Sequence, residues 1–225
     1  MKKILFSTVT SLILSSGFVY ADNIQSVGAD IGTIGIDADY TTMIMPQYNL
    51  ALRVSTGGFK YSGEYDDTDT HYDTDMSLFN LGATLEYHPF ANGWYVGLGA
   101  YYQNSNYEFD AKDTNGFYEF NGHSYEADKI GGVYGKIKDL NHFVPYLGFG
   151  YDTSLLEDDT WFFTFKAGAW YQGKPRLELT VHDCQLGPGC MLLEEDVAKE
   201  EDDINEDIKD YKWWPVIQIG VSYRF

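Results

Sequence analysis

The chain has no apolar run of the roughly 18 residues that mark a membrane-spanning helix. It is also poor in positive charge, with 15 Lys and Arg against 34 Asp and Glu. A chain so acidic repels nucleic acids, so we expect no DNA or RNA partner. G-x-S-x-G, H-E-x-x-H and Gly-rich phosphate loops are missing, and His71 has no marked nucleophile beside it. The sequence therefore predicts no enzyme, no cofactor and no metal site.

The first 21 residues have the three parts of a secretory signal peptide. Lys2 and Lys3 form a positive start, residues 4–19 are mostly apolar, and Val19 and Ala21 are small residues at a cleavage site. The alternative, a membrane anchor, is disfavoured because the apolar run is short and rich in Ser and Thr. We expect a mature protein of residues 22–225 that passes through the periplasm.

The strongest pattern in the chain is alternation with a period of two residues, which is typical of strands. The same pattern recurs in residues 48–55, 79–88, 94–103, 146–152, 163–172 and 216–225. A soluble sandwich would turn the apolar row inward, whereas a membrane barrel would turn it toward lipid. The export signal, strands of ten or more residues, and connections that alternate between short and long favour the barrel.

The strand count depends on the first segment. Six segments are clear: 47–61, 73–89, 93–109, 131–152, 160–181 and 212–225. The parity of the apolar positions changes at the sequence GTIG (32–35), which predicts a tight turn between strands 26–32 and 34–45. The alternative is one long strand with a glycine bulge. With the turn, the fold class is all-β: an eight-stranded antiparallel transmembrane barrel in the bacterial outer membrane, with extracellular loops at about 62–74, 110–130 and 181–210.

The inward-facing row contains charges of both signs. An eight-stranded barrel is just wide enough for its own side chains to fill it. Opposite charges inside it should pair, because isolated buried charges are costly. Two interpretations remain open, a plugged structural core and a narrow path for solutes. The candidate lumen and permeation residues are Arg53, Glu86, Lys136, Asp152, Lys166 and Arg224.

The last long loop has two further features. Cys184 and Cys190 bracket a QLGPG turn, and in an oxidising compartment they are predicted to form a disulfide. After them, apolar residues at helical spacing predict a short amphipathic helix; these are Leu193, Val197, Ile204 and Ile208. Its many carboxylates, with those of residues 64–75, could attract cationic solutes, hold divalent cations beside lipopolysaccharide, or simply be solvated.

Four stretches resemble a known family: GTIG (32–35), PYLGFG (145–150), YQGKP (171–175) and YKWWPV (211–216). They are similar to the CarO-type barrels of Acinetobacter and relatives, which are named for carbapenem susceptibility and also described as ornithine-uptake porins. The resemblance spans nearly the whole mature chain. The cysteine pair and the C-terminal Arg-Phe depart from the family's pattern.

The resemblance implies a monomeric eight-stranded barrel with no catalytic residues. It implies uptake of small or basic amino acids across the outer membrane. For an outer-membrane barrel we further expect outer-membrane lipid, lipopolysaccharide, the barrel-assembly machinery and a small-molecule solute as partners. The alternative is a non-conducting structural or binding barrel whose acidic loops contact lipopolysaccharide, cations or host ligands.

The likeness to outer-membrane barrels also implies that Tyr223 and Phe225 form the terminal signal that the assembly machinery recognises. Deleting Phe225 is predicted to lower the amount of folded barrel in the outer membrane, whereas Phe225→Tyr should retain it. Heat-modifiable mobility in membrane fractions measures this. Unchanged assembly after the deletion would contradict the assignment.

Overall fold

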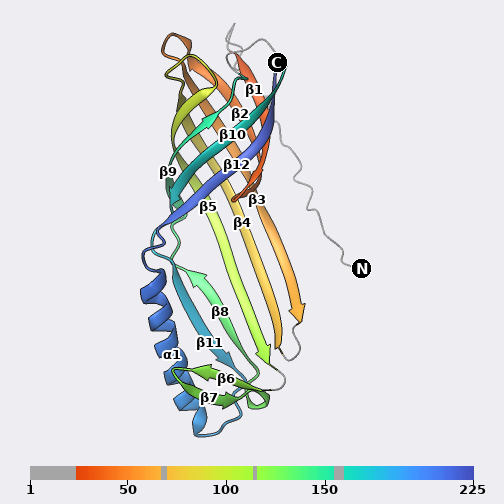
Figure 1. The fold of residues 1–225 in the computed structure, drawn as a ribbon, viewed down its shortest axis with the longest axis vertical. Helices are drawn as coiled ribbons and strands as arrows, with labels where there is room; N and C mark the ends of the chain where they lie inside the picture. Colours follow the sequence, from red (N-terminus) through yellow and green to blue (C-terminus); the bar gives the residue numbers. More distant parts are fainter. Residues whose placement is uncertain (1–23, 67–69, 114–115, 155–159) are drawn as a thin grey trace.

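The fold was taken from a computed structural model, which describes residues 24–66, 70–113, 116–154 and 160–225. The predicted signal peptide lies outside the described residues. A closed barrel occupies one half of the molecule and an elongated extension the other (Figure 1). The barrel strands are β1 (Gln25–Gly32), β2 (Gly35–Met45), β3 (Leu50–Asp66), β4 (Thr70–Tyr87), β5 (Trp94–Asp113), β9 (Phe143–Tyr151), β10 (Trp161–Tyr171) and β12 (Trp213–Arg224). The extension adds β6 (Phe117–Phe120), β7 (His123–Glu126), β8 (Gly132–Lys138), β11 (Arg176–His182) and α1 (Gly189–Ile208), and short 3-10 turns lie at Pro46–Tyr48 and Ala127–Lys129.

The barrel is closed by pairing its last strand with its first. The order is β1-β2-β3-β4-β5-β9-β10-β12, every neighbour is antiparallel, and β12 returns to β1 between the pairs Ser26↔Arg224 and Gly32↔Gln218. This confirms the predicted eight-stranded antiparallel barrel. Among the described residues, no helix has the length and apolarity required to cross a membrane.

The structure confirms the tight turn at the start of the barrel. Gly32 pairs with Gly35, and Gly35 has a φ of 103°, a conformation that side chains disfavour. Because this hairpin is short, β12 continues past its end. There the Thr33 side chain, instead of a neighbouring strand, hydrogen-bonds to the backbone of β12. Its hydroxyl donates to the Pro215 carbonyl (2.8 Å) and accepts from the Ile217 amide (3.0 Å). Backbone groups facing lipid need such partners, since lipid supplies none.

Two predicted strands, 131–152 and 160–181, were wrong as continuous elements. Each breaks at a corner, the first at Asp139 with a φ of 63° and the second at Gly173 with a φ of 86°. The outer halves, β8 and β11, leave the barrel and pair with each other, and β8 also pairs with the far part of β5. Alternation alone did not reveal the corners, because it resumes with little interruption after each one.

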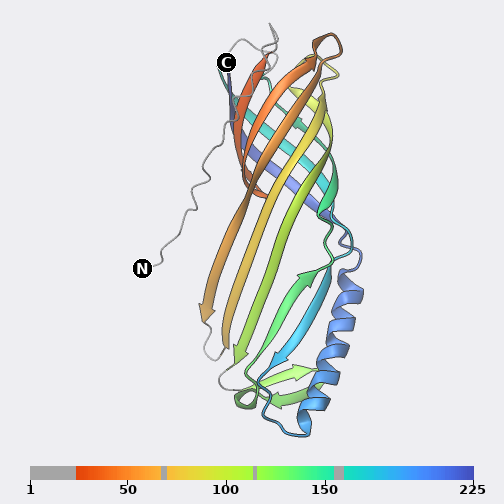
Figure 2. The same ribbon diagram turned by 180° about the vertical axis from the view of Figure 1, so that it is seen from behind.

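The predicted long loops are also more ordered than expected. Residues 62–66 and 70–74 continue β3 and β4, and residues 110–113 continue β5. Figures 1 and 2 show these strands running well beyond the barrel wall, with β8 and β11 beside them and α1 along the same side. The extension is therefore a folded structure built on the barrel's own strands.

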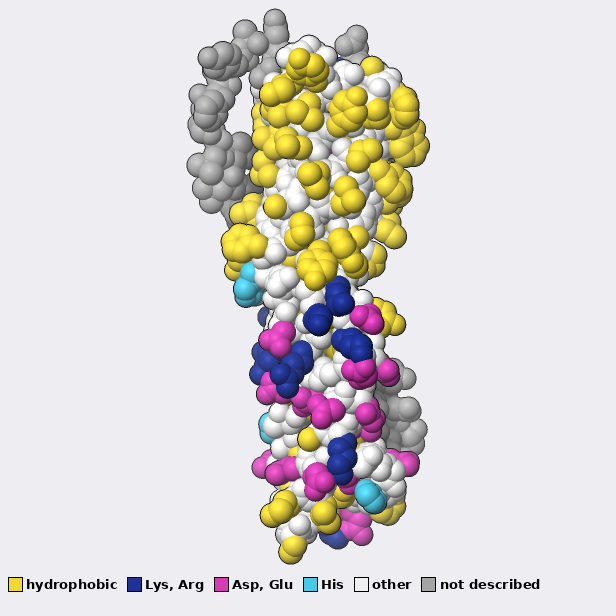
Figure 3. All heavy atoms as spheres, turned by 90° about the vertical axis from the view of Figure 1, so that its left-hand side faces the viewer, with side chains coloured by type: hydrophobic (Ala, Val, Ile, Leu, Met, Phe, Trp, Pro, Cys, Tyr) yellow, Lys and Arg dark blue, Asp and Glu magenta, His cyan; other side chains and the backbone are white. Residues whose placement is uncertain are grey.

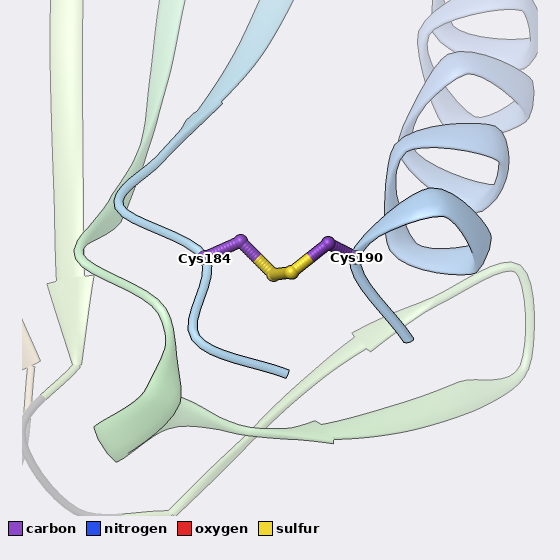
Figure 4. The surroundings of a disulfide bond; sticks show 2 residues. All are labelled: Cys184 and Cys190. Carbon is purple, nitrogen blue, oxygen red and sulfur yellow. A yellow bond between two sulfur atoms is a disulfide. The ribbon is translucent and has the colours of Figure 1, made fainter. Parts of the chain in front are cut away.

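Helix α1 is held against the extension in three ways. Leu193 and Val197, on the predicted apolar face, are buried in a cluster with Ile130. The predicted disulfide between Cys184 and Cys190 is present, with 5.9 Å between the Cα atoms, and it ties the start of α1 to the chain that follows β11 (Figure 4). The helix is confirmed but has 20 residues, longer than expected.

The third contact covers the free edge of β11. Asn205 accepts from the Leu177 amide and donates to the Leu177 carbonyl, both at 2.8 Å, and Glu201 accepts from the Leu179 amide at 2.9 Å. Side chains of α1 thus replace a neighbouring strand. An uncovered edge would be free to pair with another chain.

The outer wall of the barrel is an apolar band (Figure 3). Phe163 is 84% exposed and Leu98 is 64% exposed, values that suit lipid contact. Trp94, Trp161 and Trp213 each begin a barrel strand, the position of the interfacial aromatic girdles in membrane barrels. The alternating apolar rows therefore face outward, and the small and polar rows face the lumen.

Asp196 of α1 holds the β6–β7 hairpin in place. The carboxylate is 4% exposed and accepts from the Tyr125 hydroxyl (2.5 Å), from the Asn121 amide (3.0 Å) and from His123 Nδ1 (2.7 Å). The hydrogen bonds from Tyr125 and Asn121 are the largest causes of a lowered pKa at Asp196. Desolvation and the carboxylate raise the pKa of Tyr125 to about 12, so its hydroxyl remains a donor.

Asp196→Asn is predicted to speed amide hydrogen exchange in residues 117–126, because the charged acceptor is lost. Glu195→Gln, at the exposed neighbouring position, should leave exchange unchanged. Because the pKa of Asp196 is lowered in the folded state, its contacts stabilise the fold fully at pH values above the unfolded-state pKa of about 4. This stabilisation is lost only as the pH falls below that value. Protection should therefore persist to about pH 4; equal exchange in the two variants would contradict the role of Asp196.

Candidate functional site in the barrel lumen

Arg53 is the centre of the lumen. It lies on β3 in the inward-facing row, is 2% exposed, and contacts carboxylates from three other parts of the barrel wall. Its Nη1 lies 2.5 Å from Asp39 Oδ1, its Nε 2.6 Å from Glu86 Oε1, and its Nη2 2.5 Å from Asp152 Oδ2. The rigid fork of guanidinium donors suits such multiple pairing. One side chain thereby joins β2, β3, β4 and the end of β9 across the lumen.

Lys166 on β10 extends this network. Its Nζ lies 2.5 Å from Asp30 Oδ2 and 3.4 Å from Asp39 Oδ2, so Asp39 bridges the two cations. Thr164 donates its hydroxyl to the second oxygen of Asp30 at 2.7 Å. Buried charges are tolerated when they are paired and hydrogen-bonded in this way.

The lumen contains more carboxylates than cations. Asp37 is 2% exposed and is held by amides rather than by a cation: Asn80 donates at 3.0 Å and Gln218 at 2.7 Å. Among the described lumen residues, two buried cations thus face five buried carboxylates, which are Asp30, Asp37, Asp39, Glu86 and Asp152. The network is formally negative. Its electrostatic field would therefore attract small cations and repel anions.

An aromatic layer fills the lumen on the side nearer the extension. Tyr101 packs against Trp170 with ring centroids 5.2 Å apart and against Tyr146 at 5.7 Å. Glycines beside these rings make room for them: a Cβ at Gly82, on the neighbouring strand β4, would lie 2.2 Å from the Tyr101 ring, and one at Gly148, on the same strand as Tyr146, would lie 2.2 Å from the Tyr146 hydroxyl. The buried apolar side chains that complete the layer are Ile34, Leu78, Val144 and Val216. The lumen is therefore filled by a charged layer and an aromatic layer.

The structure brings together four of the six predicted lumen residues: Arg53, Glu86, Asp152 and Lys166. Arg224 is half-buried at the end of β12, opposite Ser26 of β1. Placing Lys136 in the lumen was wrong, because β8 leaves the barrel; its Nζ pairs with Glu108 in the extension at 2.5 Å. A role for any of them in permeation stays a prediction.

Sequence reasoning missed three members of the network on the first hairpin. Asp30, Asp37 and Asp39 alternate with the apolar residues of β1 and β2, and this parity places them inside the barrel. The signal was present in the sequence, because the same parity that predicts the turn also puts these three carboxylates in the inward row.

Comparison with solved structures found two outer-membrane barrels with nearly the same sequence identity and TM-score, and a third barrel that is less similar. CarO of Acinetobacter baumannii is 26% identical, with a TM-score of 0.61, and the match covers 91% of this chain and 98% of that one. CarO2 of the same species is 25% identical, with a TM-score of 0.61 and coverage of 90% and 98%. A major outer membrane protein from Thermus thermophilus shares the fold at 14% identity, with a TM-score of 0.50 and coverage of 92% and 100%.

Comparisons with protein-family models and with curated proteins found no match. The resemblance to CarO-type barrels is thus confirmed at the level of the fold. With the closed barrel and its apolar band, it shows that this protein is a β-barrel of the bacterial outer membrane.

Arg53→Met is predicted to lower the free energy of unfolding by about 3–5 kcal/mol, because three buried carboxylates lose their shared partner. Lys60→Met, on an exposed position of the same strand, should change it by less than about 0.5 kcal/mol. Urea unfolding of the barrel in lipid vesicles measures both. Equal stability of the two variants would show that the pairing does not hold the barrel together.

Proposed function

We propose that this protein is a closed-lumen outer-membrane barrel that displays its folded extension at the cell surface as a structural or binding element. The observation that carries the proposal is the burial of Arg53 among Asp39, Glu86 and Asp152 in the middle of the lumen. A solute path through this layer requires a fully paired guanidinium to lose partners. Passive diffusion through a static lumen is therefore disfavoured.

The orientation rests on the lengths of the connections. The β2–β3 and β4–β5 turns are short and lie at the end of the barrel that holds Phe225, while the extension grows from the opposite end (Figure 1). In bacterial outer-membrane barrels the short turns face the periplasm and the long connections face outward. We therefore assign the extension to the extracellular side.

The extension has the properties of a display element. A disulfide, a buried apolar cluster and a covered strand edge hold it in one shape. The outer face of α1 carries exposed carboxylates, including Glu194 and Glu195. Among the described residues no group of three or more acidic, His or Cys side chains is arranged to hold a metal ion. The acidic face would thus attract cations diffusely.

A second candidate function is slow passage of small cationic solutes, such as basic amino acids. The observation that favours it is the excess of carboxylates over cations in the lumen. A solute ammonium or guanidinium could exchange with Lys166 or Arg53 at these carboxylates if the aromatic layer also moved. The CarO-type resemblance implies the same solute class.

Vesicle flux separates the two functions. We expect vesicles containing the protein to take up glycine, glutamate and ornithine no faster than empty vesicles, with a large-barrel porin in matched vesicles as the positive control. Uptake of ornithine without glutamate would establish the second candidate and reject the closed barrel. Uptake of all three solutes would reject both.

A further inference from the structure

Basic side chains gather at the junction between the barrel and the extension. Figure 3 shows Lys and Arg side chains directly beyond the hydrophobic band; acidic side chains lie among them and continue toward the far end of the extension. The chain has only 15 Lys and Arg residues, so a group of five at one level is a large share of them. The group, here called the basic collar, consists of Lys138, Lys174, Arg176, Lys209 and Lys212.

The two strand breaks position the basic collar. At the corners, the Asn141 amide donates to the Gln172 carbonyl at 2.8 Å, and the Gln172 amide donates to the Lys212 carbonyl at 2.9 Å. Beyond the corners, Arg176 pairs in register with Lys138. Backbone hydrogen bonds thus hold the collar residues of β8, β11 and the start of β12 next to one another, at the level where the barrel ends.

An open surface cavity of about 480 Å³, shallow rather than enclosed, lies within the collar. Lys174, Arg176 and Lys209 line it, together with Asn205. The three cations come from two places, the β10–β11 corner and the C-terminal end of α1.

These cations have weak partners within the protein. Arg176 is 62% exposed at its side chain and lies 3.8 Å from Glu201, and Lys209 pairs with Glu206 at an exposed helical position. Lys174 makes no ion pair with any described residue. Exposed pairs contribute only about 0–1 kcal/mol, so an incoming anion can displace them.

Carboxylates in the same cavity decide which anion fits. Asp139 and Asp202 also line it and weaken its attraction for a free anion. An anion anchored by acyl chains in the adjacent apolar band does not depend on electrostatic attraction alone. Tyr211 and Trp213, which are 69% and 57% exposed near the collar, suit the interface where a lipid headgroup lies.

We propose that the basic collar is a binding site for the phosphate groups of a phosphorylated lipid in the outer leaflet. Phosphate oxygens would accept from Arg176 and from the Lys174 and Lys209 ammonium groups, while the acyl chains pack on the barrel wall. The assignment to the outer leaflet rests on the orientation given under the proposed function.

Native mass spectrometry of the folded protein in detergent micelles tests the site. The probes are lipid A with two phosphates, the same lipid A after dephosphorylation, and inorganic phosphate. The variant is Lys174→Gln/Arg176→Gln/Lys209→Gln. Its matched control is Lys60→Gln/Lys129→Gln/Lys199→Gln, which removes the same charge from exposed positions elsewhere. Heat-modifiable mobility confirms that every sample is folded.

We expect the collar variant to bind phosphorylated lipid A at least about 10-fold more weakly than the wild type, and the control to stay within about twofold. Dephosphorylated lipid A should bind the wild type as weakly as the collar variant binds the phosphorylated form. Equal losses in variant and control, or equal binding of the two lipids, would overturn the site. Inorganic phosphate that binds as tightly as lipid A would overturn the lipid as its source.

Binding in micelles does not depend on membrane orientation. Protease access to the extension in intact cells tests the orientation separately, so failure of the site and failure of the proposed display function give different results.

Discussion

The pairing of Arg53 with three buried carboxylates is the interaction on which the rest of the barrel depends. Each carboxylate comes from a different part of the wall, so the guanidinium ties four strands together across the lumen. Removing any partner leaves a buried charge with fewer partners, which is costly. The contacts that hold the strands together also fill the middle of the lumen, so stability and the proposed lack of permeability have the same cause.

Much of this fold could be read from the sequence, and the reason is the period-two pattern. In a single barrel wall, alternation predicts directly which residues face lipid and which face the lumen. It correctly placed Arg53, Glu86 and Lys166 in the lumen. The parity change at Gly32–Gly35 gave the strand count. By contrast, Lys136 was misplaced because alternation says nothing about which sheet a strand joins after a corner such as Asp139.

The extension shows what sequence patterns cannot supply. Its order comes from contacts between segments far apart in the chain, such as Asn205 with the edge of β11 and Asp196 with the β6–β7 hairpin. The same breaks that separate it from the barrel place the basic collar at the end of the barrel. A barrel wall, a basic collar and an acidic extension thus follow one another along the molecule.

Conductance of the purified barrel in a planar lipid bilayer tests the central claim most directly. A lumen closed by Arg53 and the aromatic layer predicts no resolved current steps from the wild-type protein across a range of voltages. Stable steps of constant size, unaffected by substitution of Arg53, would show that ions pass a route that the buried charges do not block.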